Sequence, residues 1–112
     1  MQINKLRYVS EWQLMRNAFP EFRAFARPPQ FGWEGYLRGK NTGRLYAIVL
    51  TSTESTYPAS RPQVFITPRF GGHWLTDGSL CIDNHQSPWD PALETFATTL
   101  LRVIKYMEQN HA

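Results

Sequence analysis

Residues 31–67 read FGWEGYLRGKNTGRLYAIVLTSTESTYPASRPQVFIT, and all of the expected strands lie in this stretch. It contains three segments rich in aromatic and β-branched residues, a composition typical of strands. These segments are 31–37, 44–51 and 63–67. The sequence GKNTG at 39–43 predicts a hairpin turn between the first two, and the prolines of 56–62 indicate a loop before the third. We therefore expect a meander of antiparallel strands.

A helix is predicted before the strands. Ser10 suits an N-cap, and Gln13 three residues later completes the pattern of a capping box. Apolar residues then recur at helical spacing, at Trp12, Met15, Ala18 and Phe19. Pro20 is expected to end or kink this helix. The segment 20–30 is assigned no element, and the sequence Arg-Pro-Pro at 27–29 indicates an extended connection.

A second helix is predicted near the end of the sequence, where Asp90 suits the N-cap and Pro91 the first helical position. An apolar stripe follows, at Leu93, Phe96, Ala97, Leu100, Leu101, Ile104 and Met107. Before this core helix, residues 69–90 show no periodicity, and so long a connection in a small domain is usually functional. The order of elements predicts an α+β fold in a single domain over residues 1–112.

The composition excludes several classes of protein. Hydrophobic residues make up 42% of the sequence, which is too many for a disordered chain. The only cysteine is Cys81, so an internal disulfide and a cysteine-cluster zinc site are ruled out. No apolar run approaches the roughly 18 residues of a membrane span, and the first residues lack the apolar stretch of a signal peptide. We therefore expect a cytoplasmic protein that stays away from membranes.

The formal net charge of +3 is unevenly distributed. Residues 1–44 hold eight Lys and Arg against three Asp and Glu, whereas residues 45–112 hold four against six. The first third therefore predicts a docking face for an acidic partner, with Arg7, Arg16 and Arg23 in it. A solvated surface is the alternative, because the basic residues are spread singly. Since no cluster of Arg and Lys is interleaved with aromatic residues, nucleic-acid binding is not expected.

Cys81 lies in the long loop and is the candidate nucleophile. A free cysteine is more often a small buried hydrophobic residue. Here, however, it stands between Gly78 and the polar run Asp83-Asn84-His85, with His73 eight residues before it. Such groups lower the pKa of a thiol or accept its proton, so the residues alone leave both interpretations open. The spacing of the histidines and Asp83 matches no zinc pattern, and neither a metal nor a cofactor is expected.

Three motifs resemble the ubiquitin-conjugating enzymes, and they occur in that family's order. Residues 57–64, YPASRPQV, resemble the family's element Tyr-Pro-x-x-x-Pro-x-Val. His73, followed by GSLCID at 78–83, resembles the active-site segment. The sequence SPWDPAL at 87–93 resembles the Trp-x-Pro entry to the helix after the catalytic cysteine. With the strand and helix pattern, the resemblance extends over residues 31–110 and implies a ubiquitin-conjugating-enzyme-like fold.

The sequence departs from the family at one motif. His73-Trp74-Leu75 stands where eukaryotic members have His-Pro-Asn, and the family's Asn is credited with supporting attack on the thioester. This departure, and an end after the post-cysteine helix, resemble the compact bacterial branch. Its members occur beside ubiquitin-like modifiers, activating enzymes and deconjugating peptidases, or in antiphage operons beside cyclic-nucleotide synthases. The resemblance thus implies three kinds of partner: the C-terminus of a modifier or substrate protein, an activating enzyme, and a cyclic-nucleotide synthase.

The resemblance also implies a mechanism. Cys81 would form a thioester with the C-terminal carbonyl of a modifier or substrate protein and pass it to a lysine amine. Asp83 would attract or deprotonate that lysine, with His85 as the alternative base. His73 would act as a general base or, as in most of the family, as a hydrogen-bonded strut of the loop. Main-chain or side-chain amides of residues 81–84 would replace the missing Asn.

Two other functions stay open on the sequence. One is a catalytically weak scaffold or binding subunit of a larger complex that keeps the fold. The other is a Cys-His hydrolase that needs no amine acceptor. Among the aromatic residues of this region, Trp89 is expected to fill the core and Tyr57 to tie the loop through its hydroxyl. Trp74 is a candidate surface aromatic for contact with a partner, with a structural place in the fold as the alternative.

Overall fold

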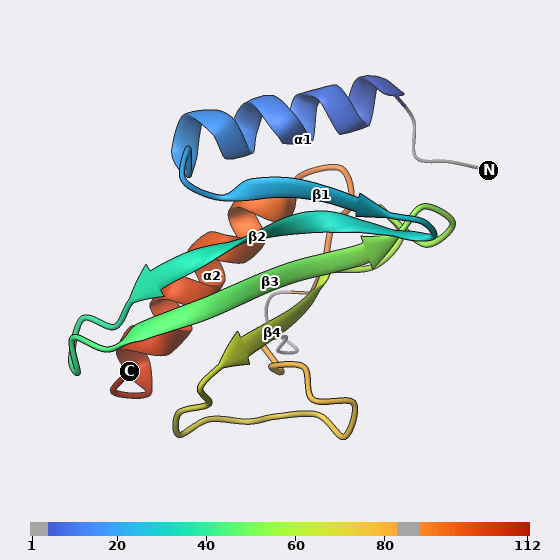
Figure 1. Cartoon of the computed structure of the whole chain (residues 1–112). Coiled ribbons are helices and arrows are strands. Elements are labelled where there is room, and N and C mark those ends of the chain that lie inside the picture. The colour runs from blue at the N-terminus through green and yellow to red at the C-terminus, as the bar shows by residue number, and fades with distance from the viewer. Residues whose placement is uncertain (1–4, 83–87) are drawn as a thin grey trace.

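The computed structural model describes residues 5–82 and 88–112. The elements are α1 (Lys5–Ala18), β1 (Arg23–Arg27), β2 (Gln30–Arg38), β3 (Leu45–Thr53), β4 (Gln63–Thr67) and α2 (Phe96–Gln109). The strands form one antiparallel sheet in the order β1-β2-β3-β4, so each strand pairs with its neighbour in sequence (Figure 1). The predicted α+β class and the predicted meander are confirmed. None of the described helices is long and apolar enough to cross a membrane.

Helix α2 packs on one face of the sheet and builds the core. Its buried residues are Phe96, Ala97, Thr99, Leu100, Val103 and Met107. They meet the inner side chains of the strands, which include Trp33, Ile48, Leu50 and Val64. The predicted apolar stripe is therefore confirmed in part. Leu93 and Leu101 are exceptions at 76% and 56% exposed, and Val103 takes an inner position instead.

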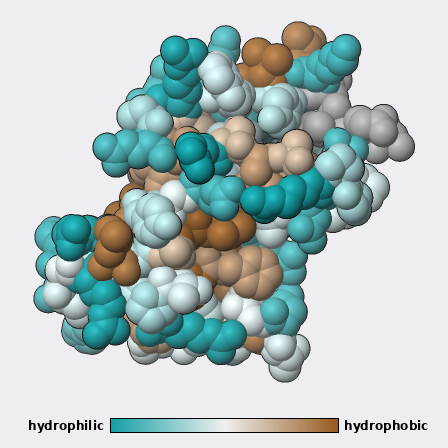
Figure 2. Space-filling view, in the orientation of Figure 1, coloured by the Kyte–Doolittle hydropathy of each residue, from teal (hydrophilic) through white to brown (hydrophobic). Residues whose placement is uncertain are grey.

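Neither of the described helices covers the opposite face of the sheet (Figure 1). Strand side chains alternate between the two faces of the sheet. Ile48 and Leu50 are buried on the inner face, so Val49 between them lies on the outer face, together with its cross-strand partner Phe65. Val49 and Phe65 are directly paired and half-buried. Figure 2 shows apolar surface over the middle of this face, bordered by polar residues.

The prediction that Asp90 and Pro91 begin the second helix is wrong. Thr95 is the N-cap, and it exchanges capping-box hydrogen bonds with Thr98. Asp90 instead holds a separate turn, because its carboxylate accepts from the Ala92 amide at 2.9 Å and its carbonyl accepts from the amide of Glu94. The sequence Asp90-Pro91 suits a helix N-terminus, but here it forms a single turn just before α2.

The first helix begins earlier than the sequence suggested. Ser10 lies inside α1, not at its start. Tertiary contacts hold the added turn, since Tyr8 stacks against Trp33 with ring centroids 6.1 Å apart. The end is as predicted, because α1 stops at Ala18, before Pro20.

Strand β1 is an element that the sequence did not predict. It pairs with β2 from Arg23↔Glu34 to Arg27↔Gln30, so Pro28 and Pro29 form a tight turn and not an extended connection. The sequence RAFAR of β1 has no β-branched residue. Pairing with the longer β2 decides its conformation, as is common for strands of weak intrinsic preference.

Candidate active site

The loop after β4 folds back on itself between His73 and Cys81. Trp74 and Leu80 form an isolated antiparallel bridge, and the Cys81 amide donates to the His73 carbonyl at 2.9 Å. At the tip, the Gly78 amide donates to the carbonyl of Leu75 at 3.0 Å. These contacts make residues 73–81 a narrow hairpin with His73 and Cys81 opposite each other.

Asp77 stabilises the tip of this hairpin. Its carboxylate accepts from the Ser79 amide at 2.8 Å, from the Ser79 hydroxyl at 2.6 Å and from the side chain of Gln63 at 2.9 Å. The hydrogen bonds from Ser79, and then that from Gln63, hold the pKa of Asp77 below its usual value. This carboxylate therefore has a structural task in the turn.

The hairpin is anchored to both β4 and α2. The Leu80 amide donates to the Val64 carbonyl at 2.8 Å, and the His73 amide donates to the Tyr106 hydroxyl at 2.8 Å. Leu80 and Ile82 are buried on either side of Cys81. Cys81 itself is partly exposed and carries a free thiol. Two buried neighbours thus hold a partly exposed cysteine at a defined place.

The structure brings together only part of the expected site. Cys81 and His73 are neighbours through their main chains, and the His73 side chain is exposed. The Cys81 amide is one of the amides at 81–84 that were expected to stabilise an oxyanion. It already donates to the His73 carbonyl, so it does not serve as that donor. Asp83 and His85 lie outside the described residues, as does Asn84. The described residues contain no group of three side chains able to hold a metal.

Two tryptophans flank the candidate site. Trp74 is half-buried, its indole N–H donates to the Phe70 carbonyl at 3.1 Å, and the Arg69 guanidinium lies 5.0 Å from its ring. Much of this ring is thus used within the chain, which favours the structural alternative for Trp74 over contact with a partner. Trp89 packs against the core as expected, and its N–H donates to the Pro58 carbonyl at 2.7 Å.

A buried carboxylate, which the sequence did not reveal, joins α1 to the start of α2. Glu11 is fully buried and accepts from the Tyr57 hydroxyl, from Arg7 Nε at 2.8 Å and from the Phe96 amide at 2.9 Å. Phe96 is the first residue of α2, where a negative charge is favoured. The spacing of Arg7 and Glu11, four residues apart on one helix, was the only signal.

Arg7 faces inward, contrary to its expected place in the docking face. Its guanidinium donates to the carbonyls of Pro91 and Glu94, each at 2.7 Å, and to the Tyr57 oxygen at 3.1 Å. It therefore clamps the turn at 90–94 against α1. Arg16 and Arg23 are exposed and remain candidates for a docking face.

Tyr57 ties α1 to its own loop, so its hydroxyl has the structural task that the sequence predicted. Burial raises the pKa of Tyr57, and the hydrogen bond to Glu11 and the negative charge of Glu11 raise it further. The phenol therefore stays protonated and donates to the carboxylate. Its ring packs on Phe96, with centroids 4.8 Å apart.

Glu94 holds the segment that follows the candidate loop. Its carboxylate meets Arg61 and Arg102, each at 3.0 Å, and accepts from the Asp90 amide at 3.0 Å. Partial burial favours the neutral acid, but the Asp90 amide and the two guanidiniums outweigh it and hold the pKa of Glu94 below its usual value. The chain after residues 83–87 is therefore fixed by charge as well as by packing.

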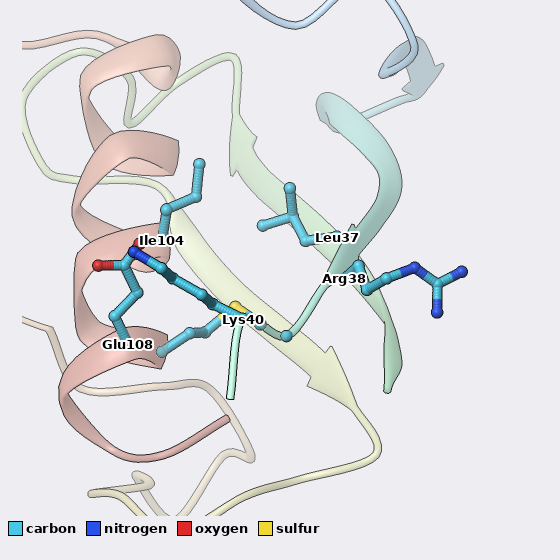
Figure 3. A pocket seen from close by; sticks show the side chains of 7 residues that line it. Leu37, Arg38, Lys40, Ile104 and Glu108 are labelled. Atoms are coloured by element: carbon cyan, nitrogen blue, oxygen red, sulfur yellow. The ribbon is translucent and has the colours of Figure 1, made fainter. Parts of the chain in front are cut away.

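A shallow hollow lies far from this chemistry, between the β2–β3 turn and the C-terminal half of α2 (Figure 3). Its walls include Leu37 and Lys40 on one side and Ile104 and Glu108 on the other (Figure 3). Cys81 does not line it.

Comparisons with protein-family models, with curated proteins and with solved structures each gave no match.

Proposed function

We propose that this chain is a ubiquitin-conjugating-enzyme-like cysteine acyltransferase, with Cys81 as its nucleophile. The observation that carries the proposal is the partly exposed Cys81, held between buried Leu80 and Ile82 in a loop between β4 and α2. The resemblance of residues 57–93 to the family's motifs points to the same cysteine.

The chemistry is two acyl transfers. The Cys81 thiolate attacks the carbonyl of a modifier or substrate C-terminus carried as a thioester by an activating enzyme, whose own thiolate leaves. A lysine amine then attacks the new thioester, the carbonyl carbon–sulfur bond breaks, and the Cys81 thiolate leaves. The amine loses a proton, for which Asp83 and His85 are the candidate acceptors by sequence position.

The main chain of His73 supports this site as a strut. Its carbonyl accepts from the Cys81 amide and its own amide donates to Tyr106, so His73 connects the cysteine to α2. The sequence left two roles open for His73, a general base and a strut of the loop. These main-chain contacts favour the strut. The exposed Arg16 and Arg23 form the proposed docking face for the activating enzyme or modifier. The genomic setting we propose is a bacterial modification or antiphage operon.

The test is the intact mass of the protein after incubation with ATP and its operon neighbours. We expect an adduct of protein size on the wild type that disappears with a thiol reductant. Cys81→Ala should give no adduct, and Cys81→Ser should give an adduct that resists the reductant because an oxyester replaces the thioester.

An adduct on Cys81→Ala would place the acyl group elsewhere and contradict the proposal. If no adduct forms while Cys81→Ala still binds the same neighbours as the wild type, a scaffold replaces the acyltransferase as the better function. Release of free modifier without any amine acceptor would favour a Cys-His hydrolase.

A further inference from the structure

Strand β1 forms one edge of the sheet. Within the described residues it pairs with β2 alone. In an antiparallel pair, alternate residues direct their main-chain N–H and C=O groups away from the partner strand. Such an edge is a template for another strand unless bulky or charged side chains block it. The side chains of β1 therefore decide whether a partner can pair with it.

The inner side of β1 carries only alanines. Ala24 pairs with Trp33 and Ala26 with Phe31, and both partners are buried, so the two alanines lie on the inner face beside α1. Figure 1 shows α1 running alongside β1 over its length. Because alanine side chains are short, they leave space between the helix and the strand.

That space holds two hollows of about 270 Å³ each, which follow one another along α1. The first is lined by Lys5, Tyr8, Val9, Ala26, Phe31 and Glu54. The second includes Trp12, Arg16, Arg23, Ala24 and Trp33. We call the two hollows together the α1–β1 groove. Apolar residues on its helix wall reach solvent, since Val9 is 50% and Trp12 40% exposed.

The groove has a positive charge. Lys5 and Arg16 line it against the single carboxylate of Glu54, and Arg23 borders it at the rim. Arg23 pairs with Glu34, so its side chain starts on the outer face of β1, beside the hollow that Glu21 and Glu34 line. Arg16 lies over the Trp12 ring at 5.1 Å, so a flat aromatic wall supports its guanidinium. A partner that matches this wall has apolar side chains for the hollows and carboxylates for the cations.

We propose that the α1–β1 groove binds an extended acidic peptide that adds a fifth strand to the sheet at β1. Its main chain pairs with the free edge, its alternate apolar side chains enter the hollows beside Ala24 and Ala26, and its carboxylates meet Arg16 and Arg23. Charge complementarity and the edge favour a peptide over a nucleic acid, which lacks a main chain that pairs with a strand. The proposal does not depend on the chemistry of Cys81.

The test uses a dye-labelled eight-residue peptide that alternates glutamate and valine, with binding followed by fluorescence anisotropy. We expect saturable binding that weakens with salt. A peptide with lysine in place of glutamate, and one with alternate main-chain amides methylated, should both fail to bind. In an NMR titration of the whole chain, the amides of Ala24 and Ala26 should shift most.

Variants locate the site. Arg16→Glu should weaken binding by about tenfold or more, and Arg23→Glu, at the rim, by about threefold or more, while Lys105→Glu on the exposed side of α2 changes it less than about twofold. Ala26→Phe should abolish binding by filling one hollow. Cys81→Ala should bind as the wild type does, so this result is independent of any thioester.

The proposal is overturned if the peptide does not bind the folded protein. It is equally overturned if Arg16→Glu and Arg23→Glu bind no worse than Lys105→Glu. Binding of a single-stranded oligonucleotide that Arg16→Glu weakens, without binding of the acidic peptide, would assign the groove to nucleic acid instead.

Discussion

Glu11 is a single side chain that satisfies donors from three parts of the chain. Its carboxylate receives hydrogen bonds from Arg7 on its own helix, from Tyr57 in the loop before β4 and from the first amide of α2. A buried charge is costly to leave without partners, and so are buried donors. The stability of the fold should therefore depend strongly on this residue.

Glu11→Gln is expected to lower the free energy of unfolding by about 3 kcal/mol, because an amide N–H would then face the donors of Arg7 and Tyr57. Urea denaturation of the variant and the wild type measures the difference. Glu21→Gln, at an exposed position, is the control and should cost less than about 0.5 kcal/mol. Equal losses from the two variants would show that Glu11 contributes nothing special.

Gly78 is required at the tip of the hairpin that carries Cys81. Its φ of +94° belongs to a region that residues with a side chain rarely adopt, and a Cβ there would lie 3.2 Å from Arg69. We expect Gly78→Ala to lower the free energy of unfolding by about 1–2 kcal/mol and to slow the reaction of the Cys81 thiol with a modifier thioester.

Gly71 provides the matched control, because nothing lies within 4 Å of the Cβ it would gain. Gly71→Ala should leave stability within about 0.5 kcal/mol of the wild type. Thermal unfolding followed by circular dichroism distinguishes the two glycines. If both alanine variants unfold at the same temperature, the turn geometry assigned to Gly78 is wrong.

At the scale of elements, Thr95 and Asp90 both accept a main-chain hydrogen bond near the start of α2. The sequence alone does not show which of the two contributes more to stability. Thr95→Ala should cost about 1 kcal/mol, because it removes the hydroxyl that accepts from the Thr98 amide. Asp90→Ala should cost less, since Asp90 caps only an exposed turn. Chemical denaturation of both variants gives the order, and the reverse order would make Asp90 the helix cap after all.

Elements with strong local signals were predictable, and those held by distant contacts were not. The strands expected at 31–37, 44–51 and 63–67 correspond to β2, β3 and β4, since β2 is rich in aromatic residues and β3 and β4 are rich in β-branched ones. β1 was missed, because its sequence RAFAR gains its conformation from β2. The first turn of α1 was missed for a similar reason, as its packing against β2 is invisible in the local sequence.

The candidate site shows the same difference between features with a local signal in the sequence and features that depend on distant contacts. The long loop with its single cysteine was evident, because it lacks periodicity and carries polar residues. The hydrogen bond that sets Cys81 opposite His73 was not, since it depends on a hairpin held by Asp77 and Gly78. Burial of Glu11 was also hidden, because a carboxylate on a helix normally faces water.

At the scale of the whole molecule, the ion cluster around Glu94 makes stability depend on pH. The pKa of Glu94 is lowered in the folded protein, so its carboxylate binds a proton more readily in the unfolded chain. The stabilising contribution is present above the unfolded pKa of about 4.3 and is lost as the pH falls through the folded value.

Glu94→Gln should therefore flatten the acid side of the stability curve. We expect the wild type to exceed the variant in stability at neutral pH, and the gap to narrow as the pH falls below about 4. Unfolding by urea at a series of pH values measures the gap. A gap that stays constant down to the most acidic point would show that the carboxylate is not charged in the folded state.

The three-way junction at Glu11 has a consequence for synthesis on the ribosome. Glu11 and the amide of Phe96 are 85 residues apart, and Glu11 and Tyr57 are 46 apart. At a translation rate of about 5–20 residues per second, the nascent carboxylate waits roughly 4–17 seconds for its last partner to be made. Until Phe96 is made, Glu11 lacks its last hydrogen-bond donor, and α1 cannot take its final place against α2. The native core is therefore expected to close only after residue 96 has left the exit tunnel.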